Sequence, residues 1–238
     1  EHTMSFDWSI VVAYWPRFWS GTLLTLKYAA IAILIAMVWG VLMGAISFRK
    51  PKILGSIVRA YICFFRETPL LVQLYFLFYG VSRYVSVSAG MMGIIALVLN
   101  DGAFVAEIVR GGLQSIDAGQ SEAAYALGFN KFQTMIYFLI PQALKKVLDS
   151  LINMISIIIK DTSMLMWITI CELTYQCNQV NIYSFNPVTS YLVGAGIYLI
   201  LFLIVQGIRY IIRAKNNSTR NAPDCAEIDD EGKGACAI

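Results

Sequence analysis

Five long apolar stretches divide this chain of 238 residues. They run near residues 20–48, 54–81, 87–110, 142–168 and 187–212. Each has about the twenty residues that a helix needs to cross ~30 Å of hydrocarbon. Hydrophobic residues make up 58% of the chain and charged residues only 14%, which is too apolar for a soluble domain of this length. The sequence therefore predicts an all-α integral membrane protein with five transmembrane helices.

The ends of the chain differ from this apolar body. The first stretch is too long for a secretory signal and has no basic leader or small-residue cleavage site, so we expect it to remain as a helix. We expect residues 1–17 to form an extracytoplasmic N-terminal segment and residues 18–213 to form the transmembrane domain. Residues 214–238 are rich in Asn, Asp, Gly and Ala, which predicts a disordered cytoplasmic tail.

Basic residues gather on one side of the predicted membrane and give the chain its orientation. On the crowded side lie Arg49, Lys50, Lys52, Arg59, Arg110, Lys131, Lys145, Lys146, Arg209, Arg213, Lys215 and Arg220. The other side has mainly Arg17, Lys27 and Arg83. Positive residues mark the cytoplasmic side, so the pattern predicts a multi-pass protein of a bacterial-type plasma membrane with its N terminus outside and its C terminus cytoplasmic. The net charge is +3, and the sequence has no basic stripe with interleaved aromatic residues. We therefore expect no nucleic-acid partner.

A polar segment at about residues 112–141 separates the third and fourth stretches. Asp117 with Gln120 has the pattern of a capping box that opens a short helix, and Gly128 can close that helix with a left-handed cap. Asn130 with Gln133 repeats the capping pattern, and the second helix then continues through Pro141 into the next apolar stretch. Two short helices at a glycine elbow predict a docking surface whose displacement reaches the membrane.

One part of this segment resembles the cytoplasmic coupling loop of ATP-binding-cassette (ABC) importer permeases in residue type and spacing. The matching residues are Glu122-Ala123-Ala124, Gly128 and Pro141. Phe138 and Ile140 depart mildly from the Ile and Leu usual in that family. Three further segments extend the resemblance to the polar amino acid branch, which serves substrates such as histidine, glutamine, glutamate, arginine and cystine. These are Phe65–Gln73, Ala106–Gly112 and Lys160–Ser163, and the whole resemblance covers about residues 18–213.

The resemblance implies the type I ABC importer (MetI-like) permease fold and a set of partners. These are an ABC ATPase subunit, an extracytoplasmic solute-binding protein and a second permease chain, either a copy or a paralogue. Glu122, Ala123, Ala124, Gly128 and Pro141 would then couple to the ATPase. The chain has no Gly-x-x-x-x-Gly-Lys-Ser/Thr loop, and its single histidine, His2, excludes a histidine-based catalytic or metal cluster in the body. We expect no enzyme activity, metal or cofactor on this chain, with ATP and Mg bound by the partner subunit.

Polar residues inside the apolar stretches are the candidates for a substrate path, because an ionisable group in lipid costs about 2.5–3.5 kcal/mol on insertion scales. The candidates are Arg66, Thr68, Gln73, Asn100, Glu107, Lys160 and Asp161. Pro69 must break its helix and free backbone carbonyls at membrane depth, which is tolerated where backbone lines a cavity. Asp101 is a weaker candidate that we expect to satisfy a neighbouring helix.

Each charged candidate also has a structural alternative. Arg66 can hold a carboxylate of a free amino acid through two parallel hydrogen bonds, or it can satisfy Glu67 or Asp161 within the bundle. Glu107 can face the path, or it can form a structural pair with Arg110. In position, Lys160-Asp161-Thr162-Ser163 resembles the segment that lines the family's central passage, and it equally suits a salt-bridged interface between two permease copies.

Together these features predict a permease subunit that imports polar amino acids by alternating access, driven by a separate ATPase subunit. The alternatives are a permease of the same superfamily for another small solute, and a non-energised channel or membrane scaffold. Six glycines are expected to let helices approach closely. They are Gly40, Gly44, Gly93, Gly194, Gly196 and Gly207.

Overall fold

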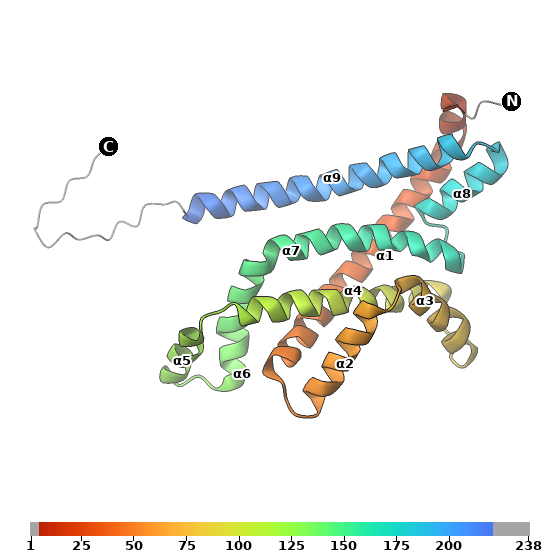
Figure 1. The fold of residues 1–238 in the computed structure, drawn as a ribbon. Helices are drawn as coiled ribbons and strands as arrows, with labels where there is room; N and C mark the ends of the chain where they lie inside the picture. Colours follow the sequence, from red (N-terminus) through yellow and green to blue (C-terminus); the bar gives the residue numbers. More distant parts are fainter. Residues whose placement is uncertain (1–4, 221–238) are drawn as a thin grey trace, which may run out of the picture.

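The fold is known from a computed structural model that describes residues 5–220, with side chains up to Ala214. Every regular element in this part of the chain is a helix (Figure 1). The longer helices are α1 (Trp8–Arg49), α2 (Leu54–Glu67), α4 (Ala89–Gln114), α7 (Ile140–Asp161), α8 (Leu173–Ser184) and α9 (Pro187–Arg220). The shorter ones are α3 (Leu70–Tyr75), α5 (Ala118–Ala126), α6 (Lys131–Gln133), the π-helices η1 (Phe76–Gly80) and η3 (Thr134–Leu139), and the 3₁₀ helices η2 (Val81–Arg83) and η4 (Thr162–Ile168).

Four helical runs in the described residues are long and apolar enough to cross a membrane. They are Trp8–Arg49, Ala89–Gln114, Lys131–Ile168 and Pro187–Ala214. The second predicted stretch is also helical, but it is divided at Pro69 into α2 and the run Leu70–Arg83. Neither piece alone has the length of a spanning helix, so this predicted crossing would need both pieces together.

The predicted boundaries at the two ends differ from the observed helices. α1 begins at Trp8, inside the segment 1–17, and Asp7 caps it by accepting a hydrogen bond from Ser9 N at 2.8 Å. α9 continues to Arg220, past residue 213. The rest of the predicted tail, residues 221–238, lies outside the described residues.

α1 crosses the bundle and packs closely against α4 (Figure 1). A methyl group at Gly44 would lie 2.6 Å from the carbonyl oxygen of Ala106, and one at Gly40 would overlap Val105, so only glycine permits this approach. A methyl group added at Gly93 or Gly194 would also overlap a neighbouring side chain, so close helix approach is confirmed at four of the six predicted glycines. Gly196 and Gly207 have no neighbouring atom within 4 Å of an added methyl group among the described residues.

The elbow formed by α5 and α6 lies at the opposite end of the bundle from the start of α1 (Figure 1). α8 packs beside the start of α1, where Phe18, Leu173, Cys177 and Val180 form a small core. Larger apolar cores lie between these ends, around Leu97 and Ile158 and around Val105 and Leu139. Polar cavities interrupt these cores in the middle of the molecule, and they hold most of the predicted path residues.

Candidate functional site

The elbow begins as predicted, with one difference in its first cap. Asp117 Oδ1 accepts a hydrogen bond from Gly119 N at 2.7 Å, which caps α5. The predicted second half of this capping box is wrong, because Gln120 Oε1 instead accepts a hydrogen bond from Gln142 Nε2 on α7 at 3.0 Å. Gln120 is thus used to join α5 to α7. The second capping box is confirmed, with both hydrogen bonds between Asn130 and Gln133 present.

The turn of the elbow depends on Gly128. Its φ of 85° lies in the left-handed region, which confirms the predicted cap and favours glycine. Phe129 and Phe138 pack edge to face across the turn with ring centroids 4.9 Å apart. α6, η3 and α7 then form one continuous helical run that contains Pro141. Since proline cannot donate to the preceding turn, the wider π-helical turn η3 just before it is a natural accommodation.

The outer face of the elbow is unusually apolar for an exposed segment. Glu122 and Ala123 are exposed, whereas Ala124 is buried against the rest of the elbow at 1% exposure. Large apolar side chains are exposed around them, namely Tyr125, Leu127, Phe132, Ile136 and Tyr137. Exposed apolar side chains concentrated on a projecting segment are typical of a surface that binds a protein partner.

The break at Pro69 is held together by two side-chain amides. Thr68 is extended, as expected for a residue before proline, so α2 ends at Glu67 and leaves carbonyls without helical partners. Gln73 Nε2 donates to the carbonyl oxygens of Phe65 at 3.0 Å and Thr68 at 2.9 Å. Asn100 Nδ2 donates to the same Phe65 oxygen at 2.9 Å and to Gln73 Oε1 at 3.0 Å. These two predicted path residues therefore support the broken backbone.

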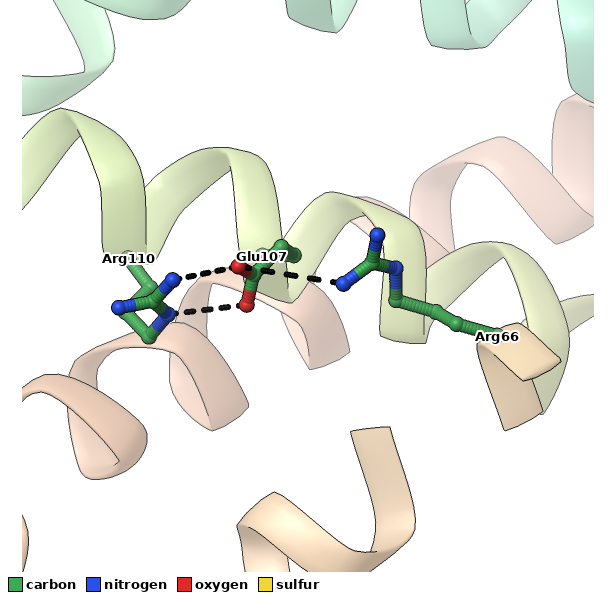
Figure 2. A network of polar contacts seen from close by, with 3 residues as sticks. All are labelled: Arg66, Glu107 and Arg110. Atoms are coloured by element: carbon green, nitrogen blue, oxygen red, sulfur yellow. Dashed lines mark hydrogen bonds and ion pairs between the residues drawn. The ribbon is translucent and has the colours of Figure 1, made fainter. Parts of the chain in front are cut away.

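Glu107 lies between two arginines (Figure 2). Arg110 donates to both of its carboxylate oxygens, at 2.9 and 2.5 Å, and Arg66 Nη1 lies 3.8 Å from Oε1. The structure thus contains the Glu107–Arg110 pair that was weighed as the structural alternative, and it adds Arg66 to that pair. Arg66 forms no ion pair with Glu67 or Asp161 in the described residues, and its guanidinium lies over the Phe104 ring at 5.5 Å.

These three residues line a cavity of about 340 Å³ whose charges are mainly positive. Lys50, Arg59, Arg66 and Arg110 face two carboxylates there, Glu67 and Glu107. We call this the basic cavity. It brings together Arg66 and Glu107, two of the candidates for the substrate path.

A second cavity, of about 240 Å³, lies beyond Phe104 and carries the opposite charge. Its polar lining consists of Thr68, Asn100, Asp101 and Asp161, and its apolar lining of Leu70, Phe104, Met154 and Ile157. We call this the acidic cavity. Asp101 is only 1% exposed, and neither of its carboxylate oxygens has a hydrogen-bond partner among the described residues. The expectation that Asp101 satisfies a neighbouring helix stays a prediction, since no donor among the described residues reaches its oxygens, but its side chain lies within hydrogen-bonding reach of Asp161 on α7.

Lys160 and Asp161 point in different directions although they are adjacent in sequence. Asp161 lines the acidic cavity, whereas Lys160 Nζ lies over the Phe202 ring of α9 at 5.6 Å. Successive residues on a helix project about 100° apart, so these two adjacent side chains face different neighbours. The structure does not bring Lys160 to the other path candidates.

One buried charged residue was missed by the sequence analysis. Glu172 is fully buried and caps α8 by accepting hydrogen bonds from Thr174 N and Tyr175 N, both at 2.8 Å. It also accepts from Tyr198 Oη at 3.0 Å and from Thr25 Oγ1 at 3.4 Å. The signal in the sequence was a lone acidic residue in the apolar region after Ile170, just before a helix start.

These features define a helical membrane protein with polar cavities inside its bundle and an exposed two-helix elbow at one end. The chain belongs to the family of binding-protein-dependent transport system inner membrane components, whose sequence profile matches residues 36–217. It is 36% identical to a putative glutamine transport system permease protein of Rickettsia typhi, over 82% of this chain and 90% of that protein. It is 32% identical to a nopaline transport system permease protein of Agrobacterium fabrum, over 84% of this chain and 88% of that protein.

Solved structures show the same architecture. One chain of an amino acid ABC transporter crystallised with histidines is 31% identical, with a TM-score of 0.80 over 89% of this chain and 99% of the other. A chain of the MetNI methionine ABC transporter, at 21% identity and a TM-score of 0.73, shares the fold over 83% of this chain and 95% of that one. The family and the MetI-like type I fold, both predicted from the sequence, are confirmed.

Proposed function

We propose that this chain is the permease subunit of an ATP-driven importer of polar amino acids. The observation that carries the proposal is the connection between the elbow and the acidic cavity. α4 supplies Asn100, Asp101 and Phe104 to the cavity, and α7 supplies Met154, Ile157 and Asp161. α4 ends just before the elbow and α7 emerges from it, so the two helices that supply most of the cavity lining are joined to the elbow.

The two sides of the elbow are tied into one unit. Lys146 Nζ on α7 donates to the Ser115 carbonyl at the end of α4 at 2.7 Å, and Gln142 on α7 bonds Gln120 on α5. A partner that pushes on the elbow would therefore move the ends of α4 and α7 together. Rigid helices would carry that motion to the cavity and change the side to which it opens, which is alternating access.

In this proposal the partner on the elbow is an ABC ATPase subunit that binds ATP and Mg. Glu122, Ala123 and Gly128 form the contact surface, Ala124 packs the elbow, and Pro141 lies where the elbow joins α7. The other partners are an extracytoplasmic solute-binding protein and a second permease chain, identical or paralogous. The distribution of basic residues supports a cytoplasmic elbow and an extracytoplasmic N terminus. The names of the relatives, which include glutamine and nopaline permeases, support an amino acid or amino acid derivative as the substrate.

The proposed path connects the two cavities. Thr68, Asn100 and Asp161 line the acidic cavity, Arg66 and Glu107 line the basic cavity, and Gln73 holds the broken backbone beside them. Arg66 is suited to a substrate carboxylate, because its Nε is buried and has no hydrogen-bond partner in the described part of the chain. Passage between the cavities would require movement of Phe104, which lines the acidic cavity and contacts Arg66 of the basic cavity.

The test is ATP-dependent uptake of radiolabelled amino acids in proteoliposomes that contain the permease, its ATPase and its binding protein. Gly128→Asp should abolish uptake or coupling, because it places a charge on the docking surface. Gly128→Asn is the matched control: asparagine has the same size, tolerates the left-handed conformation and carries no charge. Normal uptake by Gly128→Asp would show that the elbow is not the docking surface. Absence of ATP-dependent uptake of any amino acid by the unaltered complex would refute the proposed function.

A further inference from the structure

The basic cavity extends along α2 from the end of that helix to the turn between α1 and α2. Arg66 lies near the end of α2, and Arg59 lies two turns earlier, about 10 Å away along the helix axis. Lys50, which caps α1, and Ser47, one turn before it, also line the cavity. The turn between α1 and α2 lies at the same end of the bundle as the elbow (Figure 1). We call Ser47, Lys50 and Arg59 the turn site.

The two cations of the turn site have no carboxylate partner. Glu107 is already held by two arginines (Figure 2), and the other carboxylate of the cavity, Glu67, is the last residue of α2. Neither Lys50 nor Arg59 forms an ion pair within the part of the chain that the structure describes. Arg59 Nε donates to the Gly55 carbonyl of its own helix at 3.2 Å, which leaves its terminal nitrogens for a ligand. The missing partner of this site is an anion.

Ser47 is an independent sign of a ligand. It is 1% exposed, it lines the cavity, and its hydroxyl has no hydrogen-bond partner among the described residues. A serine inside a helix commonly donates to the carbonyl four residues before it, as Ser56 does to Lys52 and Ser184 does to Val180. Because buried hydroxyls are almost always paired, the free hydroxyl of Ser47 is suited to donate to a bound group.

The backbone holds Lys50 in a conformation for which glycine is the usual residue. Its φ of 51° lies in the left-handed region, and its N–H closes α1 by donating to the Ile46 carbonyl at 3.2 Å. The start of α2 packs directly on this residue, since a methyl group at Gly55 would lie 3.0 Å from Lys50 Cα. The turn itself would form more easily with glycine, so the lysine side chain serves something other than the turn.

We propose that the turn site binds the phosphate group of an anionic phospholipid. Lys50 and Arg59 supply charge-assisted hydrogen bonds to phosphate oxygens, and the Ser47 hydroxyl supplies a further donor. Basic pockets between transmembrane helices bind the head groups of anionic lipids in this way. The inference goes beyond the proposed function and requires only that the helices span a membrane. Arg66, two turns away from Arg59, stays available to the proposed path.

The surface of α2 favours a lipid over a free phosphate ion. Leu54, Ile57 and Phe64 are exposed along the same stretch of helix that carries Arg59. A phospholipid brings acyl chains that cover apolar side chains beside the phosphate, whereas a phosphate ion leaves them bare. The bound phosphate would contact α1 through Ser47 and Lys50 and α2 through Arg59, and so hold the two helices together.

The test is lipid binding to the purified full chain, delipidated in detergent and titrated while native mass spectrometry counts the bound lipid. Phosphatidylglycerol carries a net negative charge, and phosphatidylcholine with the same acyl chains carries a phosphate that choline neutralises. We expect the first phosphatidylglycerol to bind at least about tenfold more tightly than phosphatidylcholine, as hydrogen bonds between charged groups imply. Inorganic phosphate added at millimolar concentration should not displace it. Displacement would identify a site for the free ion and overturn the lipid assignment.

Lys50→Gly should weaken the binding of phosphatidylglycerol at least about fivefold, because it removes one charged donor and keeps the left-handed cap. Arg59→Gln should give a similar loss, and it leaves the turn itself unaltered. Ser47→Ala should give a smaller loss of about threefold, since it removes a neutral donor. Lys52→Gln is the matched control: it removes a positive charge from the same turn, but Lys52 does not line the cavity.

Three results would overturn the inference. They are equal binding of the two lipids by the unaltered chain, unchanged phosphatidylglycerol binding in both Lys50→Gly and Arg59→Gln, and a loss in Lys52→Gln as large as that in Lys50→Gly. The last result would show a diffuse attraction of anionic lipid to the basic turn instead of a site. None of these measurements depends on transport, so each would leave the proposed function untouched.

Discussion

Glu172 and Asp101 are both buried carboxylates in the same helical bundle, and their surroundings are opposite. Glu172, at the end of the bundle where α1 begins, accepts four hydrogen bonds from α1, α8 and α9. Asp101, in the middle of the bundle, accepts none from the described residues and faces a second carboxylate. Because buried polar groups in proteins are almost always paired, a fully paired carboxylate indicates a structural role and an unpaired one indicates a functional role.

The same contrast holds for the regions around them. Glu172 binds three helices at one end of the bundle, and Thr25 Oγ1 there also accepts a hydrogen bond from Leu173 N at 3.1 Å. Around Asp101, backbone is broken at Pro69, a cavity is left open, and α4 and α7 both lead to the elbow. The first region has the contacts of a fixed support, and under the proposed function the second is the region that changes.

The largest effect on stability is expected at Glu172. Glu172→Ala removes the cap of α8 and leaves Tyr198 and two backbone N–H groups without their acceptor, so the free energy of unfolding should fall by about 3 kcal/mol. Thermal unfolding of the detergent-solubilised protein measures the change. Glu172→Gln keeps one acceptor oxygen and should lose less. A melting temperature unchanged by Glu172→Ala would show that Glu172 has no structural role.

Gln73 supports the broken backbone of the second region and should show the next largest effect. Gln73→Leu keeps the volume but leaves the Phe65 and Thr68 carbonyls with fewer donors and removes the acceptor for Asn100, at a cost of about 2 kcal/mol. Thr68→Val is the control, because it removes one of these partners only. If Gln73→Leu melts with the unaltered protein, the carbonyls at Pro69 have another source of hydrogen bonds.

Asp101 should respond with the opposite sign. Asp101→Asn replaces an unpaired carboxylate by an amide that can donate to Asp161, so stability without amino acid should stay the same or rise by about 1 kcal/mol. The measurement is again the melting temperature, taken in buffer free of amino acids. A loss as large as that of Glu172→Ala would mean that Asp101 has a structural partner and that the comparison fails.

Features that depend on neighbouring residues could be predicted from the sequence. The elbow follows from local caps at Asp117, Gly128 and Asn130, and the break follows from Pro69, because each acts within one turn of its own backbone. The exception is instructive: Gln120 has the right spacing for a capping box, but a tertiary partner, Gln142, takes its side chain.

Features that depend on helix register and on distant contacts could not be predicted. Glu172 and Thr25 are 147 residues apart, and nothing local in the sequence joins them. Lys160 and Asp161 were expected together on the path, but one residue of helical rotation sends them to different neighbours. Asp101 was given the weaker role for the same reason, since its lack of partners is visible only when α4, α7 and the Pro69 break are assembled.

The smallest effect is expected at Asp149, a carboxylate that is paired but not buried. Asp149 Oδ1 lies 3.2 Å from Arg209 Nε, so it is paired like Glu172, but its side chain is 44% exposed. Exposed ion pairs contribute about 0–1 kcal/mol, because solvent and salt screen them and two long side chains lose freedom. Asp149→Asn should therefore lower the melting temperature only slightly, and the difference from the unaltered protein should shrink as salt is raised. Arg209→Gln leaves the longer pair of Asp149 with Arg213, at 3.9 Å, in place and should lower the melting temperature no more than Asp149→Asn does. A loss near that of Glu172→Ala would show that pairing alone sets the size of the effect; a small loss would show that a carboxylate of this bundle becomes structurally important only when it is both paired and buried.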